Sequence, residues 1–198
     1  MTNFGKATFC FLGRSGSGKD TQAKLLLEVL KKDGYQVFNV STGDQGRKLQ
    51  ETNTIVGRHI KKILSRGGLL SDWLAISLWM DLLQEKGLND EVIFFPSSPR
   101  YLREAQAMDE LMSGGGRPLP IPIYVDINNE EATKRLLARS REDDTDKVIA
   151  ERLSWFEEQV FPIIDYYDKR VIKIDGLGEE MEIHKRVLEA LKTLNYEI

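Results

Sequence analysis

One glycine-rich stretch, FCFLGRSGSGKDTQAKLL (residues 9–26), constrains the fold more than any other part of the sequence. Before the glycines, residues 7–12 form a short run of apolar and β-prone side chains, which is typical of a buried strand. After the glycines, Ala23, Leu26 and Leu30 recur at helical spacing, which predicts a helix with one apolar face. The chain is therefore expected to pass from a buried strand through a glycine loop directly into a helix.

The loop has the spacing of an anion-binding turn. Its three glycines permit backbone angles that other residues resist, so several N–H groups can turn inward at the positive end of the following helix. Lys19 adds a point charge suited to the β- and γ-phosphates of a nucleotide. The pattern G-x-x-x-x-G-K is imperfect, because Asp20 follows the lysine and the hydroxyl comes one place later. The candidate phosphate-binding residues are Ser15, Gly16, Ser17, Gly18, Lys19, Asp20 and Thr21.

Strand-like and helix-like segments alternate along the rest of the chain. Further apolar strands are predicted at residues 35–40, 91–95, 121–127 and 171–174. Helices are predicted at residues 101–112, 129–139, 144–167 (bent near Pro162) and 179–194, with a capping turn at 41–44 before a weaker helical region at 45–64. This alternation predicts a three-layer α/β/α fold, a parallel sheet with helices on both faces. Ligands of such sheets bind at the carboxyl ends of the strands, where the glycine loop begins.

Arginines collect after the predicted strands. Six candidates are Arg47, Arg100, Arg135, Arg139, Arg141 and Arg152. Phosphoryl transfer requires such a set, because the protein supplies positioning and positive charge, and arginine grips phosphate oxygens with two parallel hydrogen bonds. Any one of these arginines, taken alone, is equally well explained as a solvated charge or a surface ion pair.

Composition excludes several classes of function. The net charge of −3 argues against a broad nucleic-acid-binding surface. The single cysteine, Cys10, makes an internal disulfide scaffold impossible and fits a reducing compartment. The sequence begins without a long apolar segment, and no run has the length of a membrane span. We expect a cytoplasmic protein that associates with neither membranes nor nucleic acids.

Taken together, the motifs resemble those of one family over nearly the whole chain. They are GRSGSGKDTQ (13–22), STGDQGR (41–47), ILSRGGLLSD (63–72), SPRYLREA (98–105), RLLARSREDD (135–144) followed by ERL (151–153), and IDGLG (174–178). Their order and separation resemble those of adenylate kinase and the wider nucleoside monophosphate kinases. The resemblance implies a single P-loop domain over residues 1–198, with five parallel strands in the order 2-3-1-4-5. It also implies a helical monophosphate-binding insert at 42–70 and a vestigial lid at 139–141.

The resemblance also implies roles for individual residues. On the ATP side it implies the phosphate loop with Arg135, Arg139 and the backbone near Gly178. On the acceptor side it implies Thr42, Arg47, Arg100, the backbone at Gly68, Leu69 and Leu70, and the bridging arginines Arg141 and Arg152. Catalytic roles fall on Lys19, Arg100, Arg139, Arg141 and Arg152. ATP as co-substrate, Mg²⁺ and a monomer acting on small-molecule nucleotides are implied, and zinc is not expected because a lid cysteine cluster is missing.

Three positions depart from the family pattern. Pro96 stands where the family has an aspartate that orders water around Mg²⁺, so Asp44, with Asp20, is expected to take more of that role. Glu104 stands where the family has the glutamine that reads adenine. An ionised carboxylate only accepts hydrogen bonds, so it suits the N–H groups of guanine better than the N1 of adenine, unless it is protonated or acts through water. The lid is reduced to a few residues, which leaves the exclusion of water unexplained.

The sequence therefore predicts a phosphotransferase that moves the γ-phosphate of ATP to a nucleoside monophosphate, with AMP as the first choice. One alternative is a kinase for GMP, CMP or a deoxynucleotide. The other is a nucleotide-binding protein with little turnover, which is suggested by Pro96 in the place of the family's aspartate. A regulatory GTPase fits poorly, because it would need a hydroxyl directly after Lys19 and an Asn-Lys-x-Asp motif.

Overall fold

A five-stranded parallel sheet forms the centre of the molecule. The structure, a computed structural model, describes residues 4–66, 68–84, 90–139 and 146–194. The strands are β1 (Thr8–Leu12), β2 (Val37–Asn39), β3 (Val92–Phe95), β4 (Ile121–Asp126) and β5 (Ile172–Asp175). Their order across the sheet is β2-β3-β1-β4-β5, and every neighbouring pair is parallel. The predicted fold class and strand order are therefore confirmed.

Helices connect the strands. They are α1 (Lys19–Lys32), α2 (Thr42–Gln50), α3 (Ile55–Leu64), α4 (Asp72–Gln84), α5 (Leu102–Gly114), α6 (Asn129–Arg139), α7 (Asp146–Trp155), a π-helical segment (Phe156–Val160), α8 (Phe161–Tyr167), a 3₁₀ turn (Asp168–Arg170) and α9 (Glu180–Lys192). Within the described ranges, no helix combines the length and apolar character needed to cross a membrane.

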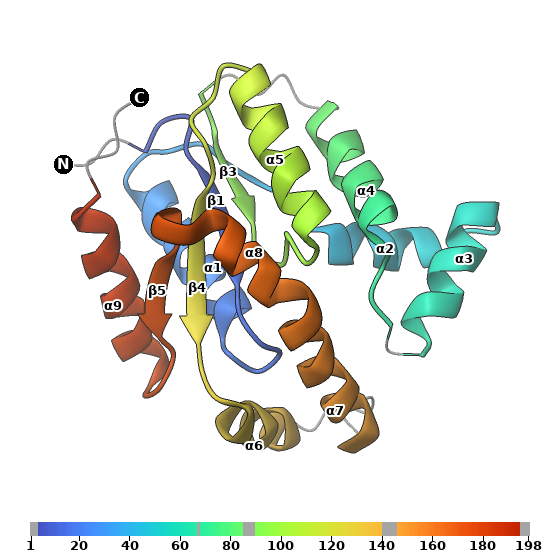
Figure 1. The fold of residues 1–198 in the computed structure, drawn as a ribbon. Coiled ribbons are helices and arrows are strands. Elements are labelled where there is room, and N and C mark those ends of the chain that lie inside the picture. The colour runs from blue at the N-terminus through green and yellow to red at the C-terminus, as the bar shows by residue number, and fades with distance from the viewer. Residues whose placement is uncertain (1–3, 67, 85–89, 140–145, 195–198) are drawn as a thin grey trace.

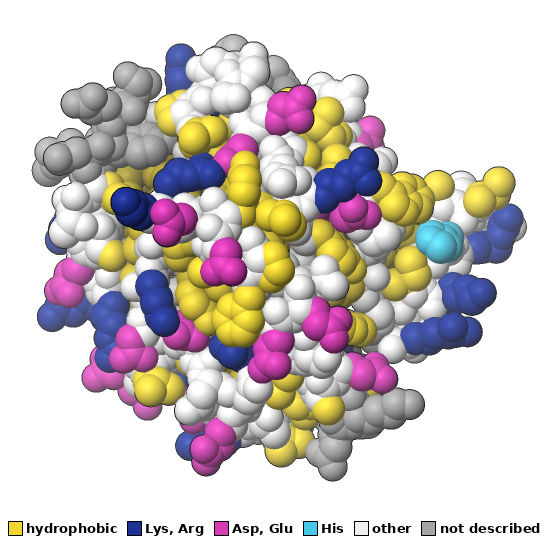
Figure 2. Space-filling view, viewed as in Figure 1, with side chains coloured by type: hydrophobic (Ala, Val, Ile, Leu, Met, Phe, Trp, Pro, Cys, Tyr) yellow, Lys and Arg dark blue, Asp and Glu magenta, His cyan; other side chains and the backbone are white. Residues whose placement is uncertain are grey.

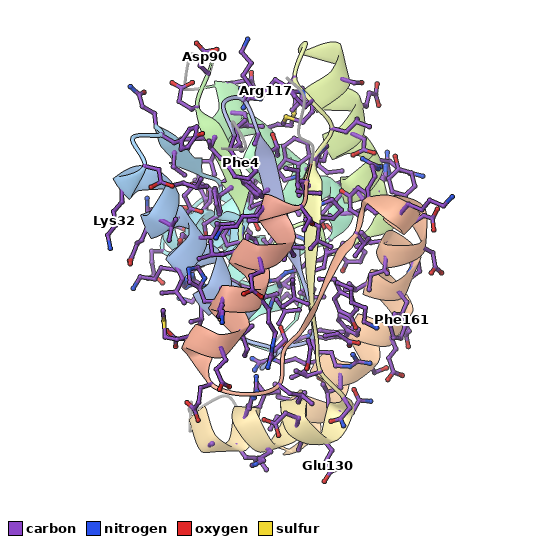
Figure 3. The ribbon with its side chains drawn as sticks, turned by 90° about the vertical axis from the view of Figure 1, so that its left-hand side faces the viewer. Phe4, Lys32, Asp90, Arg117, Glu130 and Phe161 are labelled. Carbon is purple, nitrogen blue, oxygen red and sulfur yellow. The ribbon has the colours of Figure 1, made fainter. Side chains whose placement is uncertain are left out.

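Both faces of the sheet are covered, which gives the three layers (Figure 1). On one face, α1 and α9 pack over alternate strand residues such as Phe9 and Phe11. On the other face, α4, α5 and α8 pack over the intervening residues, among them Leu12 and Phe95. Figure 3 shows this arrangement from the side, with α1 and α8 on opposite sides of the strands and side chains filling the space between them. Strands buried on both faces explain the continuous apolar runs of the sequence.

Strand β1 lies at the centre of this arrangement. All five of its residues are buried, and it pairs with β3 on one side and β4 on the other. Cys10, opposite Phe95 of β3 and Pro122 of β4, is 0% exposed. Burial raises the pKa of its thiol to about 12. Cys10 is thus a core residue, as its place in an apolar run predicts.

Helices α2 and α3 form a small unit beside the sheet. The unit packs on α4 through a separate apolar cluster that contains Ile60, Leu74 and Leu78. Figure 2 shows Lys and Arg side chains gathered on the projecting part of the molecule formed by α3, which carries Arg58, Lys61 and Lys62.

Two local predictions need correction. The sequence predicts a turn at residues 42–44, but these residues form the first turn of α2. The hydroxyl of Ser41 accepts the Asp44 N–H and so caps the helix one residue before Thr42. The long helix near Pro162 is not simply bent. It contains a π-helical segment directly before α8, and Pro162 lies in the first turn of α8, where its missing N–H is not needed.

Candidate active site

The glycine loop leaves β1 at the carboxyl edge of the sheet and enters α1 at Lys19. Gly13 has φ +149°, and a Cβ atom there would lie 2.6 Å from Ser17 Oγ and 2.7 Å from the carbonyl oxygen of Val125. Gly16 has φ +85°, and its Cβ would lie 2.9 Å from the carbonyl oxygen of Ala132. The loop therefore packs too tightly against β4 and α6 for any larger residue at these two positions.

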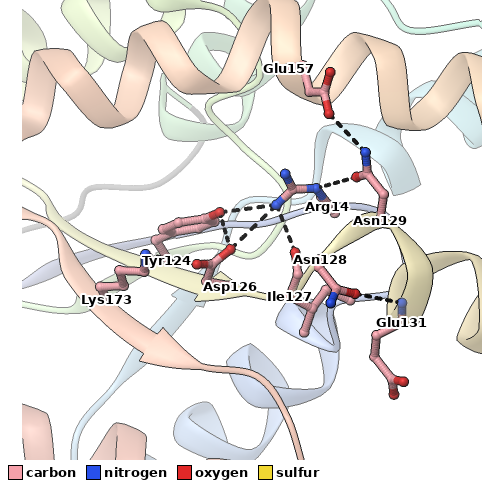
Figure 4. A network of polar contacts seen from close by, with 9 residues as sticks. All are labelled: Arg14, Tyr124, Asp126, Ile127, Asn128, Asn129, Glu131, Glu157 and Lys173. Carbon is pink, nitrogen blue, oxygen red and sulfur yellow. Dashed lines mark hydrogen bonds and ion pairs between the residues drawn. The ribbon is translucent and has the colours of Figure 1, made fainter.

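Arg14 holds the loop in place through a network of polar contacts (Figure 4). Its Nε donates to Asn129 Oδ1 at 2.7 Å, and its Nη1 donates to the carbonyl oxygen of Ile127 at 2.8 Å and lies 3.4 Å from Asp126 Oδ1. Its guanidinium carbon lies 4.4 Å from the centre of the Phe156 ring. Arg14 is 8% exposed, so these contacts join the phosphate loop to β4, α6 and the π-helical segment.

Arg14 is not among the site residues predicted from the sequence, and its partner Asp126 ends β4. Asp126 also binds two other side chains. The Tyr124 hydroxyl donates to Asp126 Oδ1, and Lys173 Nζ lies 2.9 Å from Asp126 Oδ2. Burial, followed by the hydrogen bond to Asp126, raises the pKa of the Tyr124 hydroxyl. A glycine loop with one arginine carries no local signal for these partners, which lie 110 or more residues further along the chain.

The phosphate loop forms one wall of a cleft of about 530 Å³. Ser15, Gly16 and Lys19 line the cleft from the loop, and Arg47, Arg100 and Arg152 line it from α2, the segment after β3 and α7. Its charged lining residues are the cations Lys19, Arg47, Lys61, Arg100 and Arg152 and the acids Asp20 and Glu51. This cation excess would attract and orient a polyphosphate. The structure thus brings Lys19 and three of the six predicted arginines to one cleft.

A smaller pocket, of about 110 Å³, opens beside this cleft on the acceptor side, and we call it the acceptor pocket. Its lining residues are Thr42, Gly43, Gly46, Arg47, Leu64, Gly68, Leu70, Ala75, Ser98, Arg100 and Glu104. Arg47 and Arg100 line both spaces, so a ligand in the acceptor pocket can present a phosphate to the cleft. Leu69 lines the cleft rather than the acceptor pocket. An apolar wall with a few convergent polar groups is the usual make-up of a small-molecule site.

Glu104 is buried in the wall of the acceptor pocket, at 1% exposed. Its Oε1 accepts the backbone N–H of Arg100 at 3.1 Å. Among the described residues its Oε2 has no hydrogen-bond partner. Burial raises the pKa of the Glu104 carboxyl to about 7. The backbone N–H and positive charge of Arg100, followed by the Ser98 hydroxyl and the Tyr101 N–H, only partly oppose this rise.

The segment at residues 96–100 connects the acceptor side to the phosphate loop. The Ser97 hydroxyl donates to Asp20 Oδ1 at 2.8 Å, and Arg100 Nε donates to the carbonyl oxygen of Ser97 at 2.9 Å. Lys19 Nζ lies 3.9 Å from the same oxygen of Asp20. The hydroxyl next to Pro96 therefore contacts the carboxylate next to Lys19, and this contact links the two sides of the cleft.

Asp20 and Asp44 are the carboxylates that fit a role toward Mg²⁺. Both line a hollow that also includes Pro96 and Ser97. Hydrogen bonding with Ser41, followed by that with Arg47, lowers the pKa of Asp44, which keeps it ionised. The described residues contain no group of three or more His, Cys, Asp or Glu side chains arranged for a metal. Mg²⁺ commonly keeps several waters and needs only one or two carboxylates besides substrate phosphates, so this pair suits it.

The remaining predicted residues lie at the loop after β5 or outside the described part. Arg135 Nε donates to Glu131 Oε1 at 2.7 Å, and its Nη2 donates to the carbonyl oxygen of Gly176 at 3.0 Å, so it contacts the loop after β5 rather than the wall of the cleft. Gly178, with φ +105°, lies in that same loop. Two predicted catalytic arginines cannot be placed in the site. The structure describes only the backbone of Arg139, and Arg141 lies outside the described residues.

Some predicted backbone contacts are already used within the loop. The Ser17 N–H donates to the carbonyl oxygen of Arg14 at 3.0 Å, and the Ser17 hydroxyl accepts the Lys19 N–H at 3.4 Å. Ser17 is fully buried and supports the loop from inside. The N–H groups around Ser17 remain the predicted phosphate ligands.

A phosphate loop at the edge of a parallel sheet, facing a second pocket across a cation-lined cleft, defines a P-loop nucleotide-binding fold with two ligand subsites. The family model described as adenylate kinase matches residues 11–172. The chain is similar to the adenylate kinase of Stenotrophomonas maltophilia, at 33% identity over 187 residues, which cover 91% of this chain and 97% of the relative. It is similar to the adenylate kinase of Thermus thermophilus at 34% identity, covering 91% and 95% of the two chains. The adenylate kinase of Prochlorococcus marinus is 34% identical over 190 residues, covering 94% and 99%. The chain belongs to the adenylate kinase family.

Proposed function

We propose that the protein transfers the γ-phosphoryl group of ATP to AMP and releases two molecules of ADP. The observation that carries this proposal is that Lys19 of the phosphate loop and Arg47 and Arg100 of the acceptor side line one cleft. Membership of the adenylate kinase family supports AMP over other acceptors. The protein acts on small-molecule nucleotides, as a monomer.

On the donor side, the loop N–H groups and Lys19 hold the β- and γ-phosphates of ATP. The loop after β5, near Gly178, meets the adenine of ATP, and Arg135 stabilises that loop through Gly176. On the acceptor side, Arg47 and Arg100 grip the phosphate of AMP, Thr42 contacts the nucleotide, and the base enters the acceptor pocket between Gly68, Leu70 and Glu104. Leu69 faces the cleft between the two nucleotides.

In the transfer step, a phosphate oxygen of AMP attacks the γ-phosphorus of ATP, and the bond from that phosphorus to the β–γ bridging oxygen breaks. Lys19, Arg100 and Arg152 surround the transferring group and stabilise the charge on its oxygens. Arg139 and Arg141 are proposed to complete this charge stabilisation from the lid. Mg²⁺, when bound, neutralises charge on the ATP phosphates, and Asp20 and Asp44 would hold it through water.

A coupled assay of ADP formation, run with AMP, GMP, CMP and UMP, tests the proposal. We expect turnover with AMP, and we expect Lys19→Ala to lower it by roughly two orders of magnitude or more, because a charge contact to the transition state is lost. Lys31→Ala is the matched control, since Lys31 lies exposed at the other end of α1. Near-normal activity of Lys19→Ala would exclude the loop as the donor site. Nucleotide binding without turnover would favour the low-turnover alternative that Pro96 raises.

A further inference from the structure

One wall of the acceptor pocket contains a buried carboxylate oxygen of Glu104. Glu104 lines the pocket, and its Oε2 is buried without a hydrogen-bond partner in the described part of the chain, whereas Oε1 accepts the Arg100 N–H. Buried polar atoms are almost always paired, so an orphan atom in the wall of a binding pocket points to a partner on the ligand. The pocket is small and partly apolar, which suits one face of a flat base.

The hydrogen bond at Oε1 decides where a proton on this carboxyl would lie. Because Oε1 accepts an N–H, it acts as the carbonyl oxygen, and a proton on the acid belongs to Oε2. In its neutral form Glu104 therefore presents an O–H donor to the pocket, and in its ionised form it presents an acceptor at the same atom. The neutral form therefore binds a hydrogen-bond acceptor on the ligand, whereas the ionised form binds a donor.

The groups around Glu104 keep the two forms close in energy. Arg100 favours the carboxylate through its N–H and its charge, and the Ser98 hydroxyl and the Tyr101 N–H favour it as well. Arg47 of α2 lines the same pocket. Burial, followed by the negative charges of Glu104 and of Asp72 in α4, raises the pKa of the Tyr101 hydroxyl, which therefore stays neutral beside Glu104. Burial outweighs these effects and raises the pKa of Glu104 to about 7.

We infer that Glu104 sorts acceptor bases by its protonation state. The neutral acid donates Oε2–H to a ring nitrogen that carries a lone pair, as N1 of AMP does. The carboxylate accepts from a ring N–H, as the N1–H of IMP or GMP provides. This inference rests on the proposed function, in that it places the acceptor base in the pocket of Glu104.

AMP and inosine monophosphate (IMP) are the matched probes, because they share ribose, phosphate and ring shape. AMP has N1 with a lone pair and an amino group, and IMP has N1–H and an oxo group in the same places. The effect of pH on the shared phosphate, on ATP and on the other catalytic groups cancels in the ratio of kcat/KM for AMP to kcat/KM for IMP. Only a group that distinguishes the two rings makes this ratio depend on pH.

The sign of the dependence follows from the pKa of Glu104. At about pH 6 the carboxyl is mostly neutral, and at about pH 8 it is mostly ionised, since its pKa lies near 7. We expect the ratio to fall by about tenfold or more between these values, because a mismatched polar contact in a buried pocket changes binding by roughly ten- to hundredfold. Glutamine keeps an acceptor and a donor at all these pH values, so Glu104→Gln should hold the ratio constant and in favour of AMP.

Steady-state kinetics of the wild type, Glu104→Gln and Glu110→Gln, each with AMP and IMP across this pH range, tests the inference. Glu110 lies exposed on the same helix, so its replacement should leave the falling ratio intact. A wild-type ratio that does not change with pH, in an enzyme that phosphorylates AMP, would overturn the inference and leave the proposed function standing. Absence of turnover with every monophosphate would instead contradict the proposed function.

Proton linkage gives a second test that needs no variant. Calorimetric titration of the wild type in two buffers of different ionisation enthalpy measures the protons taken up or released on binding. Near pH 7, we expect AMP binding to take up more protons than IMP binding, because AMP selects the neutral acid. Equal proton uptake for the two nucleotides would overturn the inference.

Discussion

Replacing Glu104 by glutamine removes an ionisable group from the interior, and we expect this to change how protein stability depends on pH. Glutamine has the same shape and can still accept the Arg100 N–H that Glu104 Oε1 accepts. The main difference is that glutamine cannot ionise. Comparing the two proteins without nucleotide therefore isolates the free energy of burying a charge at this position.

The expected magnitude comes from the shift in pKa. The ordinary value is 4.5 and burial raises the pKa of Glu104 to about 7, so the folded state binds the proton more tightly than the unfolded chain. The free energy of unfolding of the wild type is thus unaffected by this group below about pH 4.5 and falls as pH rises toward and through 7. A difference of about 2.5 pKa units corresponds to about 3 kcal/mol. The difference in free energy of unfolding between Glu104→Gln and the wild type should therefore be larger at pH 8 than below about pH 4.5, by about that amount and in favour of the variant.

Urea unfolding at a series of pH values measures this difference by linear extrapolation. Other groups contribute to the pH dependence of each protein. His184, for example, is 4% exposed and burial lowers its pKa, so it makes stability rise with pH. Such contributions are present in both proteins and cancel in the difference. Parallel curves of stability against pH for the wild type and Glu104→Gln would refute the reasoning. They would mean that Glu104 ionises as easily in the folded protein as in the unfolded chain.

Two further predictions concern arginines of the site. Replacing Arg47 or Arg100 by alanine should raise the KM for AMP by about ten- to hundredfold with a smaller effect on ATP, since a charged hydrogen bond to the acceptor phosphate is lost; an equal loss for both nucleotides would contradict the assignment. Arg14→Met should lower the free energy of unfolding by about 2 kcal/mol, because a mostly buried guanidinium and its hydrogen bonds are removed while Lys173 still pairs with Asp126. A change in urea unfolding of less than about 0.5 kcal/mol, the level of an ordinary surface substitution, would show that the Arg14 network is not structural.

The features predictable from sequence are those that local pattern determines. The apolar run at 7–12, the glycines and the leucine spacing after them predict β1, the loop and α1, and the structure places each there. The strand order came from the family resemblance and is confirmed. The start of α2 was missed because Ser41, Thr42 and Asp44 are all residues that favour the N-cap, and only the structure shows that Ser41 fills this position.

The features that sequence could not predict depend on distant parts of the chain. Arg14 becomes structural only because β4 and α6 bring Asp126 and Asn129 to it. The resemblance places Glu104 at the base site, but its burial depends on the assembled acceptor pocket, which α2 and α4 also line. This burial raises the pKa of Glu104 into the physiological range. The roles assigned to the site residues stay predictions, and the lid residue Arg141 lies outside the described part.

Because Cys10 is buried in the central strand, its chemical labelling can report how often the protein opens. The chain has a single thiol, in the central strand, fully buried and with its pKa raised to about 12, so it reacts with a disulfide or maleimide reagent only in molecules that have opened. The labelling rate then measures the population of opened molecules. A nucleotide that binds only the closed molecule slows labelling in proportion to its occupancy, whether or not phosphoryl transfer follows. Binding by catalytically inactive variants can therefore be measured at a sulfur atom in the core, away from the cleft.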